Sequence, residues 1–225
     1  ERAAVIDYQH LLNHHIKEVK PSGIRRFFDI ANEMDDVISL SIGEPDFTTP
    51  WHVREAGIES LQKGKTWYTP NRGFAELRQE ICKYFARRFH VQYHPDTDVL
   101  VTVGGSEAID LCIRTLVNPG EEVLIPQPSF VCYEPMVQMA LGKPVIIETK
   151  IENNFRLTAQ ELREHITDKT KLLILPYPNN PTGGVMRREH MEEIAEVIKQ
   201  HDIIVLSDEI YSELTYGDRP PVSFS

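Results

Sequence analysis

The sequence predicts an α/β fold built on a mainly parallel, doubly wound sheet covered by helices on both faces. Short runs of consecutive apolar residues recur along the chain, as strands buried on both faces require. Stretches with helical periodicity alternate with these runs, which is typical of strands joined by crossover helices. The predicted strands are 99–103, 122–126, 144–149, 171–176 and 203–207. The predicted helices are 50–63, 73–89, 106–117, 132–140, 158–165 and 188–200.

Composition argues against several kinds of partner. The chain has 225 residues and a formal net charge of −10, and so acidic a surface repels nucleic-acid phosphates and anionic lipid. No apolar run approaches the ~18 residues of a membrane helix, and the first residues lack the features of a signal peptide. Cys82, Cys112 and Cys132 form no CxxC pair, which favours free thiols over a disulfide framework or a zinc site. We therefore expect a cytoplasmic enzyme with no metal, membrane or nucleic-acid partner.

The segment after the first predicted strand could bind an anion. Ligands of such sheets bind at the carboxyl ends of the strands. Gly104 and Gly105 permit a tight turn there, and Ser106 stands where a helix N-cap is expected. Free backbone N–H groups at that helix start, with the Ser106 hydroxyl, suit a phosphate. An ordinary capped turn could have the same sequence, and this segment alone does not decide between a phosphate site and such a turn.

Two further strand ends carry side chains that could contact a flat ring. After 122–126, prolines flank Phe130 in a stiff loop that could present an aromatic face, although a core aromatic is the simpler alternative. After 171–176, Pro181 favours an extended Asn180 and Gly183 permits a close turn. An asparagine amide fixed there can donate to a ring oxygen. A simple turn would explain it too, but not the density of proline, asparagine and glycine.

The last predicted strand ends in Asp208, and Tyr211 follows three residues later. A carboxylate at the end of an apolar strand is costly unless a cation pairs with it. A protonated pyridine nitrogen is one such cation, and the carboxylate would keep it protonated. The segment also resembles the magnesium-binding strand of a P-loop NTPase, with Gly64-Lys65-Thr66 as the end of its phosphate loop. We reject that alternative because Glu59 stands where the loop requires glycine.

Together these segments resemble the class I, or fold-type I, pyridoxal-phosphate (PLP) aminotransferases. The resemblance extends from about Ser22 to Ser225 and is carried by IGEPDF (42–47), YTPNRGFAELRQEI (68–81), GGSEAI (104–109), PNNPTGG (178–184) and SDEIYSELTY (207–216). Within the family, the sequence looks most like the bacillus-type N-acetyl-diaminopimelate aminotransferases. The resemblance implies a three-layer α/β/α PLP-binding large domain over 48–225, incomplete at its C-terminus. It assigns 1–47 to an N-terminal arm and part of a small domain.

The resemblance also implies which residues bind the cofactor phosphate and ring. Gly105, Ser106 and Glu107 would bind the phosphate of PLP through backbone N–H groups and the Ser106 hydroxyl. Phe130 would stack on the pyridine ring. Tyr68 would reach the phosphate in the neighbouring subunit, which implies a homodimer.

Further roles concern the ring edge and the substrate. Asn180 and Tyr211 would hydrogen-bond the phenolic oxygen of the ring, and Asp208 would pair with its nitrogen. Asp208 and Tyr211 are thus the implied catalytic residues. The backbone at Gly43 would approach the carboxylate of the substrate.

The implied reaction is ping-pong transfer of an amino group from an amino acid to a 2-oxo acid, expected to be 2-oxoglutarate. Chains of this family are longer than this one. The Schiff-base lysine and the substrate-binding arginine are expected beyond Ser225, and no lysine present matches the family position. Two alternatives stay open. One is a PLP-dependent lyase or synthase on the same fold, and the other is a catalytically silent fragment or sensor domain. A sensor domain should carry a basic winged helix upstream, for which 1–47 is too short.

Overall fold

The computed structural model describes residues 9–19, 23, 30, 34, 38, 43, 47–216 and 222–225. The chain divides into two compact units, Glu1–Lys20 with Ala75–Ser225 and Pro21–Phe74. The domain boundary expected after residue 47 stays a prediction. No helix in the described ranges has the length and apolar character needed to cross a membrane.

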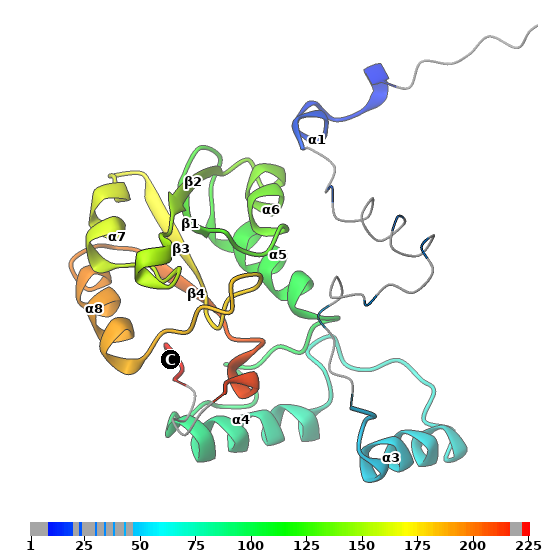
Figure 1. Cartoon of the computed structure of the whole chain (residues 1–225). Coiled ribbons are helices and arrows are strands. Elements are labelled where there is room, and N and C mark those ends of the chain that lie inside the picture. Colours follow the sequence, from blue (N-terminus) through cyan, green and yellow to red (C-terminus); the bar gives the residue numbers. More distant parts are fainter. Residues whose placement is uncertain are drawn as a thin grey trace, which may run out of the picture. The chain divides into compact units, whose positions relative to one another are not determined.

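Four parallel strands form the sheet of the first unit (Figure 1). They are β1 (Glu122–Gln127), β2 (Lys143–Glu148), β3 (Thr170–Pro176) and β4 (Ile204–Asp208). Their order is β2-β1-β3-β4, and each neighbouring pair is parallel. The prediction of a parallel sheet is therefore confirmed for these four strands.

The predicted strand at 99–103 is wrong. Its residues form no β-ladder with any strand of the described chain. Val99 is buried, but Leu100 and Val103 are 54% and 93% exposed. A strand is defined by hydrogen bonds to a neighbour, and an apolar run cannot by itself reveal whether a neighbour is there.

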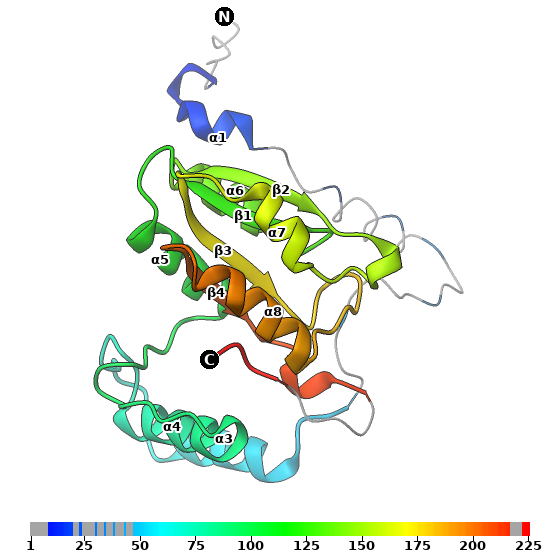
Figure 2. The same cartoon turned by 90° about the vertical axis from the view of Figure 1, so that its left-hand side faces the viewer.

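Helices cover both faces of the sheet, which gives the predicted three layers. Leu124 and Leu173 pack in one core with α7 (Ala159–His165) and α8 (Arg188–Ile198). Their neighbours in the strands point the opposite way and pack with α5 (Gly105–Leu116) and α6 (Tyr133–Met139). Figure 2 shows α7 and α8 on one face and α5 behind the sheet. The alternation of side chains along a strand explains why consecutive residues are all apolar here.

The remaining predicted helices also form. They are α3 (Trp51–Gln62) in the second unit and α4 (Ala75–Phe89) in the first. A short α1 (His14–Glu18) and three single-turn 3₁₀ helices complete the set in the described ranges: η1 (Gln9–Leu11), η2 (Ile151–Asn153) and η3 (Ser212–Leu214).

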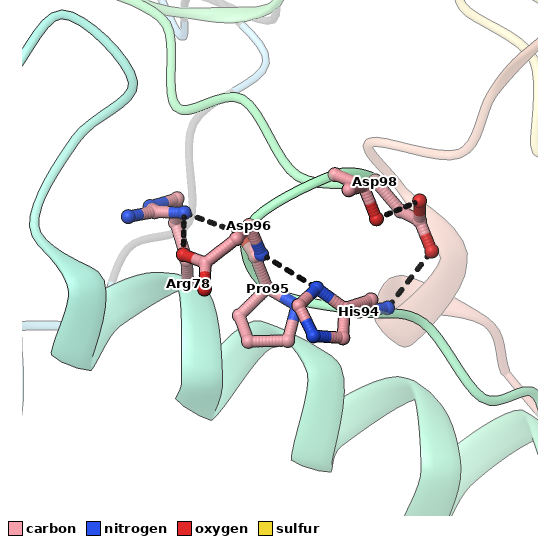
Figure 3. Close-up of polar contacts among 6 residues, drawn as sticks. Arg78, His94, Pro95, Asp96 and Asp98 are labelled. Carbon is pink, nitrogen blue, oxygen red and sulfur yellow. Dashed lines mark hydrogen bonds and ion pairs between the residues drawn. The ribbon is translucent and has the colours of Figure 1, made fainter.

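A polar turn at 94–98 joins α4 to the segment that leads to α5 (Figure 3). Arg78 of α4, which is 8% exposed, donates to the Pro95 carbonyl and to Asp96 Oδ1 at 2.8 Å. Asp98 accepts from the His94 backbone N–H at 2.8 Å. That bond, followed by one from Thr97, lowers the pKa of the Asp98 carboxyl. The turn is fixed at both ends by these contacts.

Candidate active site

A small cavity lies where the carboxyl ends of β1, β3 and β4 meet the start of α5. Its volume is about 120 Å³. Its walls are Gly105, Ser106, Ile109, Phe130, Tyr133, Pro176, Pro178, Asn180, Asp208, Ile210 and Tyr211. The structure therefore brings together most of the residues that the sequence selected, namely Gly105, Ser106, Phe130, Asn180, Asp208 and Tyr211. This is the edge of the sheet at which α/β proteins bind ligands.

The start of α5 differs by two positions from the predicted cap. Gly104 is the N-cap with a φ of 85°, and the helix begins at Gly105, so the prediction of Ser106 as the N-cap is wrong. Glycine adopts positive φ without steric cost, which lets the cap fall on Gly104. Ser106 lies in the first turn and is exposed. The backbone N–H groups of that turn have no acceptor within the helix, so the anion-binding geometry is kept.

Glu107 does not line the cavity. Its carboxylate accepts a hydrogen bond from the backbone N–H of Val103. That contact closes the turn ahead of α5, and it differs from a capping box in that the donor is the residue before the N-cap Gly104. The role implied for Glu107 uses its backbone N–H and stays a prediction.

Tyr133 is a residue of the site that sequence reasoning missed. It is 2% exposed, and its hydroxyl donates to Asp208 Oδ2 at 2.7 Å. Its ring meets Phe130 edge to face, with centroids 5.8 Å apart. Tyr133 is the second residue of the predicted helix 132–140, and in the sequence it looks like an ordinary core position of that helix. The sequence signal that could have identified Tyr133 is its place three residues after Phe130, in the segment that follows the same strand.

Asp208 is an acceptor without a cation. Burial, followed by the charge of Asp208, raises the pKa of Tyr133 far above its usual value, so the Tyr133 hydroxyl stays protonated and Asp208 accepts from it. The other oxygen of Asp208 accepts from the Ile210 backbone N–H at 3.2 Å. Over the ranges that the structure describes, no lysine or arginine pairs with Asp208. A half-buried carboxylate at the cavity wall is thus left to accept from a positively charged ligand group.

The loop 178–184 is held by Asn179, which sequence reasoning did not select. Asn179 is 5% exposed, and its Nδ2 donates to the Pro128 carbonyl at 2.8 Å and to Thr182 Oγ1 at 3.1 Å. The Asn179 backbone bonds to both Gly183 and Gly184. Asn179 thus fixes the loop, while its exposed neighbour Asn180 lines the cavity.

Tyr211 is held by a network that begins two residues later. Glu213 in η3 accepts from Arg88 Nε and Nη2 at 2.8 and 2.9 Å and from the Tyr84 hydroxyl at 2.6 Å. Arg88, followed by Tyr84, lowers the pKa of Glu213. These bonds tie η3, which Tyr211 caps, to α4.

Glu209 makes a second such tie. Its Oε1 accepts from Ser207 Oγ at 2.7 Å, Ser223 Oγ at 3.0 Å and the Phe224 backbone N–H at 2.9 Å. Val222 and Phe224 also pack on the core beside α8. The segment 222–225 is therefore docked on Glu209, the residue that follows Asp208 in the chain.

Tyr68 and Gly43 belong to the second unit. Tyr68 is fully exposed among the described residues, and Gly43 is also exposed. Their implied roles stay predictions. Over the described ranges, no group of three or more His, Cys, Asp or Glu side chains could hold a metal ion.

The chain belongs to the aminotransferase family: the family model "Aminotransferase class I and II" matches residues 35–224. An aspartate aminotransferase of Pyrococcus abyssi is 47% identical to it, over 89% of this chain and 51% of the relative. The "Probable N-acetyl-LL-diaminopimelate aminotransferase" of Bacillus subtilis is 43% identical, over 96% of this chain and 55% of the relative. A crystal structure titled Pyrococcus protein-A1 superposes with a TM-score of 0.90 and 45% identity, over 93% of this chain and 54% of that one. The chain spans about half the length of the curated relatives it matches.

Proposed function

We propose that the intact protein is a PLP-dependent aminotransferase and that the cavity at the carboxyl ends of the strands holds the ring of PLP. Aminotransferases of class I and II depend on this cofactor. The observation that carries the proposal is Asp208, a half-buried carboxylate that accepts from Tyr133 and has no cationic partner among the described residues. A protonated pyridine nitrogen would supply the missing charge.

The other residues of the cavity fit the same group. The first turn of α5 offers the N–H groups of Gly105, Ser106 and Glu107 to a phosphate. Phe130 offers an aromatic wall for a flat ring. Asn180 and Tyr211 offer polar groups that can donate to a ring oxygen.

When bound, PLP supplies an electron sink for the substrate's Cα carbanion. Asp208 would hold a proton on the ring nitrogen, and Tyr133 would hold Asp208 in place. Asn180 and Tyr211 would orient the ring through its oxygen. The apolar walls Ile109 and Ile210 would exclude water from one side.

The finer features of the function are also proposals. We propose 2-oxoglutarate as the amino-group acceptor and a homodimer in which Tyr68 completes the partner's phosphate site. We also propose a cytoplasmic role in amino-acid biosynthesis, which the three unpaired cysteines support. Relatives named for aspartate and for N-acetyl-LL-diaminopimelate are about equally similar, so either is a candidate donor.

The test is a transamination assay on the intact protein with PLP, 2-oxoglutarate and a panel of amino acids, beside the variants Asp208→Asn and Asp208→Ala. Asp208 would stabilise the protonated ring nitrogen, so its loss should lower turnover by roughly 100-fold or more, or about 3 kcal/mol of activation free energy, while the fold is retained. Full activity of both variants with PLP bound would remove Asp208 from the mechanism. Absence of PLP binding in the unaltered protein would refute the proposed function.

A further inference from the structure

A second hollow, of about 460 Å³, is formed by the loops 151–156 and 182–187. It shares no lining residue with the cavity around Asp208. Both hollows use the loop 178–184, which contributes Pro178 and Asn180 to one and Thr182, Gly183 and Gly184 to the other. We call the second hollow the Arg156 pocket.

Two arginines line the Arg156 pocket in a protein whose net charge is −10. Arg156 is half-buried, and its Nε donates to the Asn153 carbonyl at 2.9 Å. No described carboxylate forms an ion pair with it. Arg187 is exposed, and its contact with Glu189 is long, at 4.0 Å. A half-buried guanidinium that bonds a backbone carbonyl but no described carboxylate has N–H groups available to an anion in the hollow.

His190 does not provide an acceptor for the N–H groups of Arg156 that face it. Its Nδ1 accepts from the Arg187 backbone N–H at 3.0 Å, while its Nε2 lies 3.0 Å from Nη1 of Arg156. A neutral imidazole can accept at only one ring nitrogen. With Nδ1 as the acceptor, the Nε2–H and an N–H of Arg156 are two donors facing each other. Burial, followed by the charge of Arg156, lowers the pKa of His190, so the ring is neutral near pH 7.

Thr182 adds a third donor to the pocket wall. Its Oγ1 accepts from Asn179 Nδ2 at 3.1 Å and from the Gly184 backbone N–H at 3.1 Å. Its own hydroxyl proton has no acceptor among the described residues and is left to donate. Gly184 also keeps the two loops close, because a Cβ there would lie 3.0 Å from the Asn154 carbonyl oxygen.

We propose that the Arg156 pocket binds a small oxyanion, a phosphate or carboxylate group, between Arg156, Arg187 and the Thr182 hydroxyl. An oxyanion accepts from several donors at once and would give the N–H groups of Arg156 an acceptor that His190 does not provide. It would also neutralise Arg156. The site is distinct from the cofactor phosphate site at α5 and does not depend on the proposed function.

The experiment is calorimetric titration of the intact protein, loaded with PLP so that the cofactor phosphate site is filled. Inorganic phosphate and succinate are titrated separately, which distinguishes a phosphate from a carboxylate ligand. We expect saturable binding of at least one of them. Arg156→Gln should weaken it at least about tenfold, the size of one charge-assisted bond. Arg163→Gln, which removes the same charge from an exposed position of α7, should leave it unchanged.

A second readout follows the ring of His190 by NMR. Binding of the anion should raise the pKa of His190, because it cancels part of the charge of Arg156. This readout reports on the pocket even in protein without PLP, so failure of the proposed function and failure of the anion site can be told apart. Arg156→Lys keeps the charge and guards against a folding defect. The proposal is overturned if neither anion binds saturably, or if Arg156→Gln and Arg163→Gln bind equally well.

Discussion

The hydroxyl of Tyr133 donates to Oδ2 of Asp208 across 2.7 Å and so joins the start of α6 to the end of β4. The raised pKa of Tyr133 keeps the proton on the phenol, and the bond therefore has one direction. It selects one orientation of the Asp208 carboxylate without neutralising it.

Tyr133→Phe should lower the turnover of the PLP-loaded intact protein by roughly tenfold or more, because a hydrogen bond to a charged group is worth ~1.5–3 kcal/mol. The measurement is kcat at saturating PLP across pH. Tyr177→Phe is the matched control: its buried hydroxyl bonds to Leu157 and Phe155, outside the cavity. The control should lower Tm and leave kcat nearly unchanged. Equal kcat in Tyr133→Phe and the unaltered protein would contradict the prediction.

Ser106→Ala should weaken PLP binding by about 10- to 100-fold, since the hydroxyl is one charge-assisted donor to a phosphate. The chemical step of the loaded enzyme should change much less. Fluorescence titration with PLP measures the first quantity and single-turnover kinetics the second. Glu107→Gln keeps the backbone N–H and serves as the control, with affinity close to that of the unaltered protein. Unchanged affinity in Ser106→Ala would indicate a plain helix start.

Glu122→Gln should destabilise the fold. Glu122 is 4% exposed and accepts from Thr167 Oγ1 at 2.6 Å and Lys143 Nζ at 2.9 Å. The loss should be about 1–3 kcal/mol at pH 7, measured by urea unfolding. Glu148→Gln, at an exposed position at the carboxyl end of the neighbouring strand β2, is the control.

The effect of Glu122 should also depend on pH. The bonds from Thr167, followed by Lys143, lower its pKa below 4.5 in the folded protein. The unfolded state then binds the proton more tightly, so the contribution is complete above pH 4.5 and is lost as the pH falls through the lower folded value. The gap between Glu122→Gln and the unaltered protein should shrink in acid. A gap that stays constant would assign the effect to packing.

Tyr68 should act across the proposed homodimer. It is fully exposed among the described residues, so it is free to meet a second copy. We expect co-expression of a Tyr68→Phe protomer with a protomer lacking the Schiff-base lysine to restore activity, because one site of each mixed dimer has both intact residues. The assay is turnover of purified mixed dimers beside each parent. Mixed dimers as inactive as the parents would place Tyr68 outside the partner's site.

The parallel sheet could be predicted because β1 and β3 place consecutive apolar residues on two buried faces. Pairing could not be predicted, and 99–103 shows why: its apolar run has no bonded neighbour in the described chain. The location of the cavity could also be predicted, because parallel strands have their carboxyl ends at one edge of the sheet and ligands bind there.

Site residues were predictable where a side chain contradicts its surroundings. Asp208 is a charged residue at the end of an apolar strand, which is unusual. Tyr133 is an ordinary residue for a buried helix face, and only the fold shows that it lies beside Asp208. The sequence analysis selected Asn180 and not Asn179, because only the structure shows which of the two is buried. The cap at Gly104 depended on a backbone angle that the order of two glycines does not specify.

The loop 178–184 forms part of the wall of two hollows, with Asn179 locked between them. A substitution at Thr182 or Gly184 could therefore disturb both hollows, one by moving Asn180 and the other by changing the surroundings of Arg156. Natural variation in this stretch should be narrower than in the turn 94–98, which faces neither hollow. Deep mutational scanning under cofactor limitation and under anion limitation would assign each tolerated change to one wall or the other.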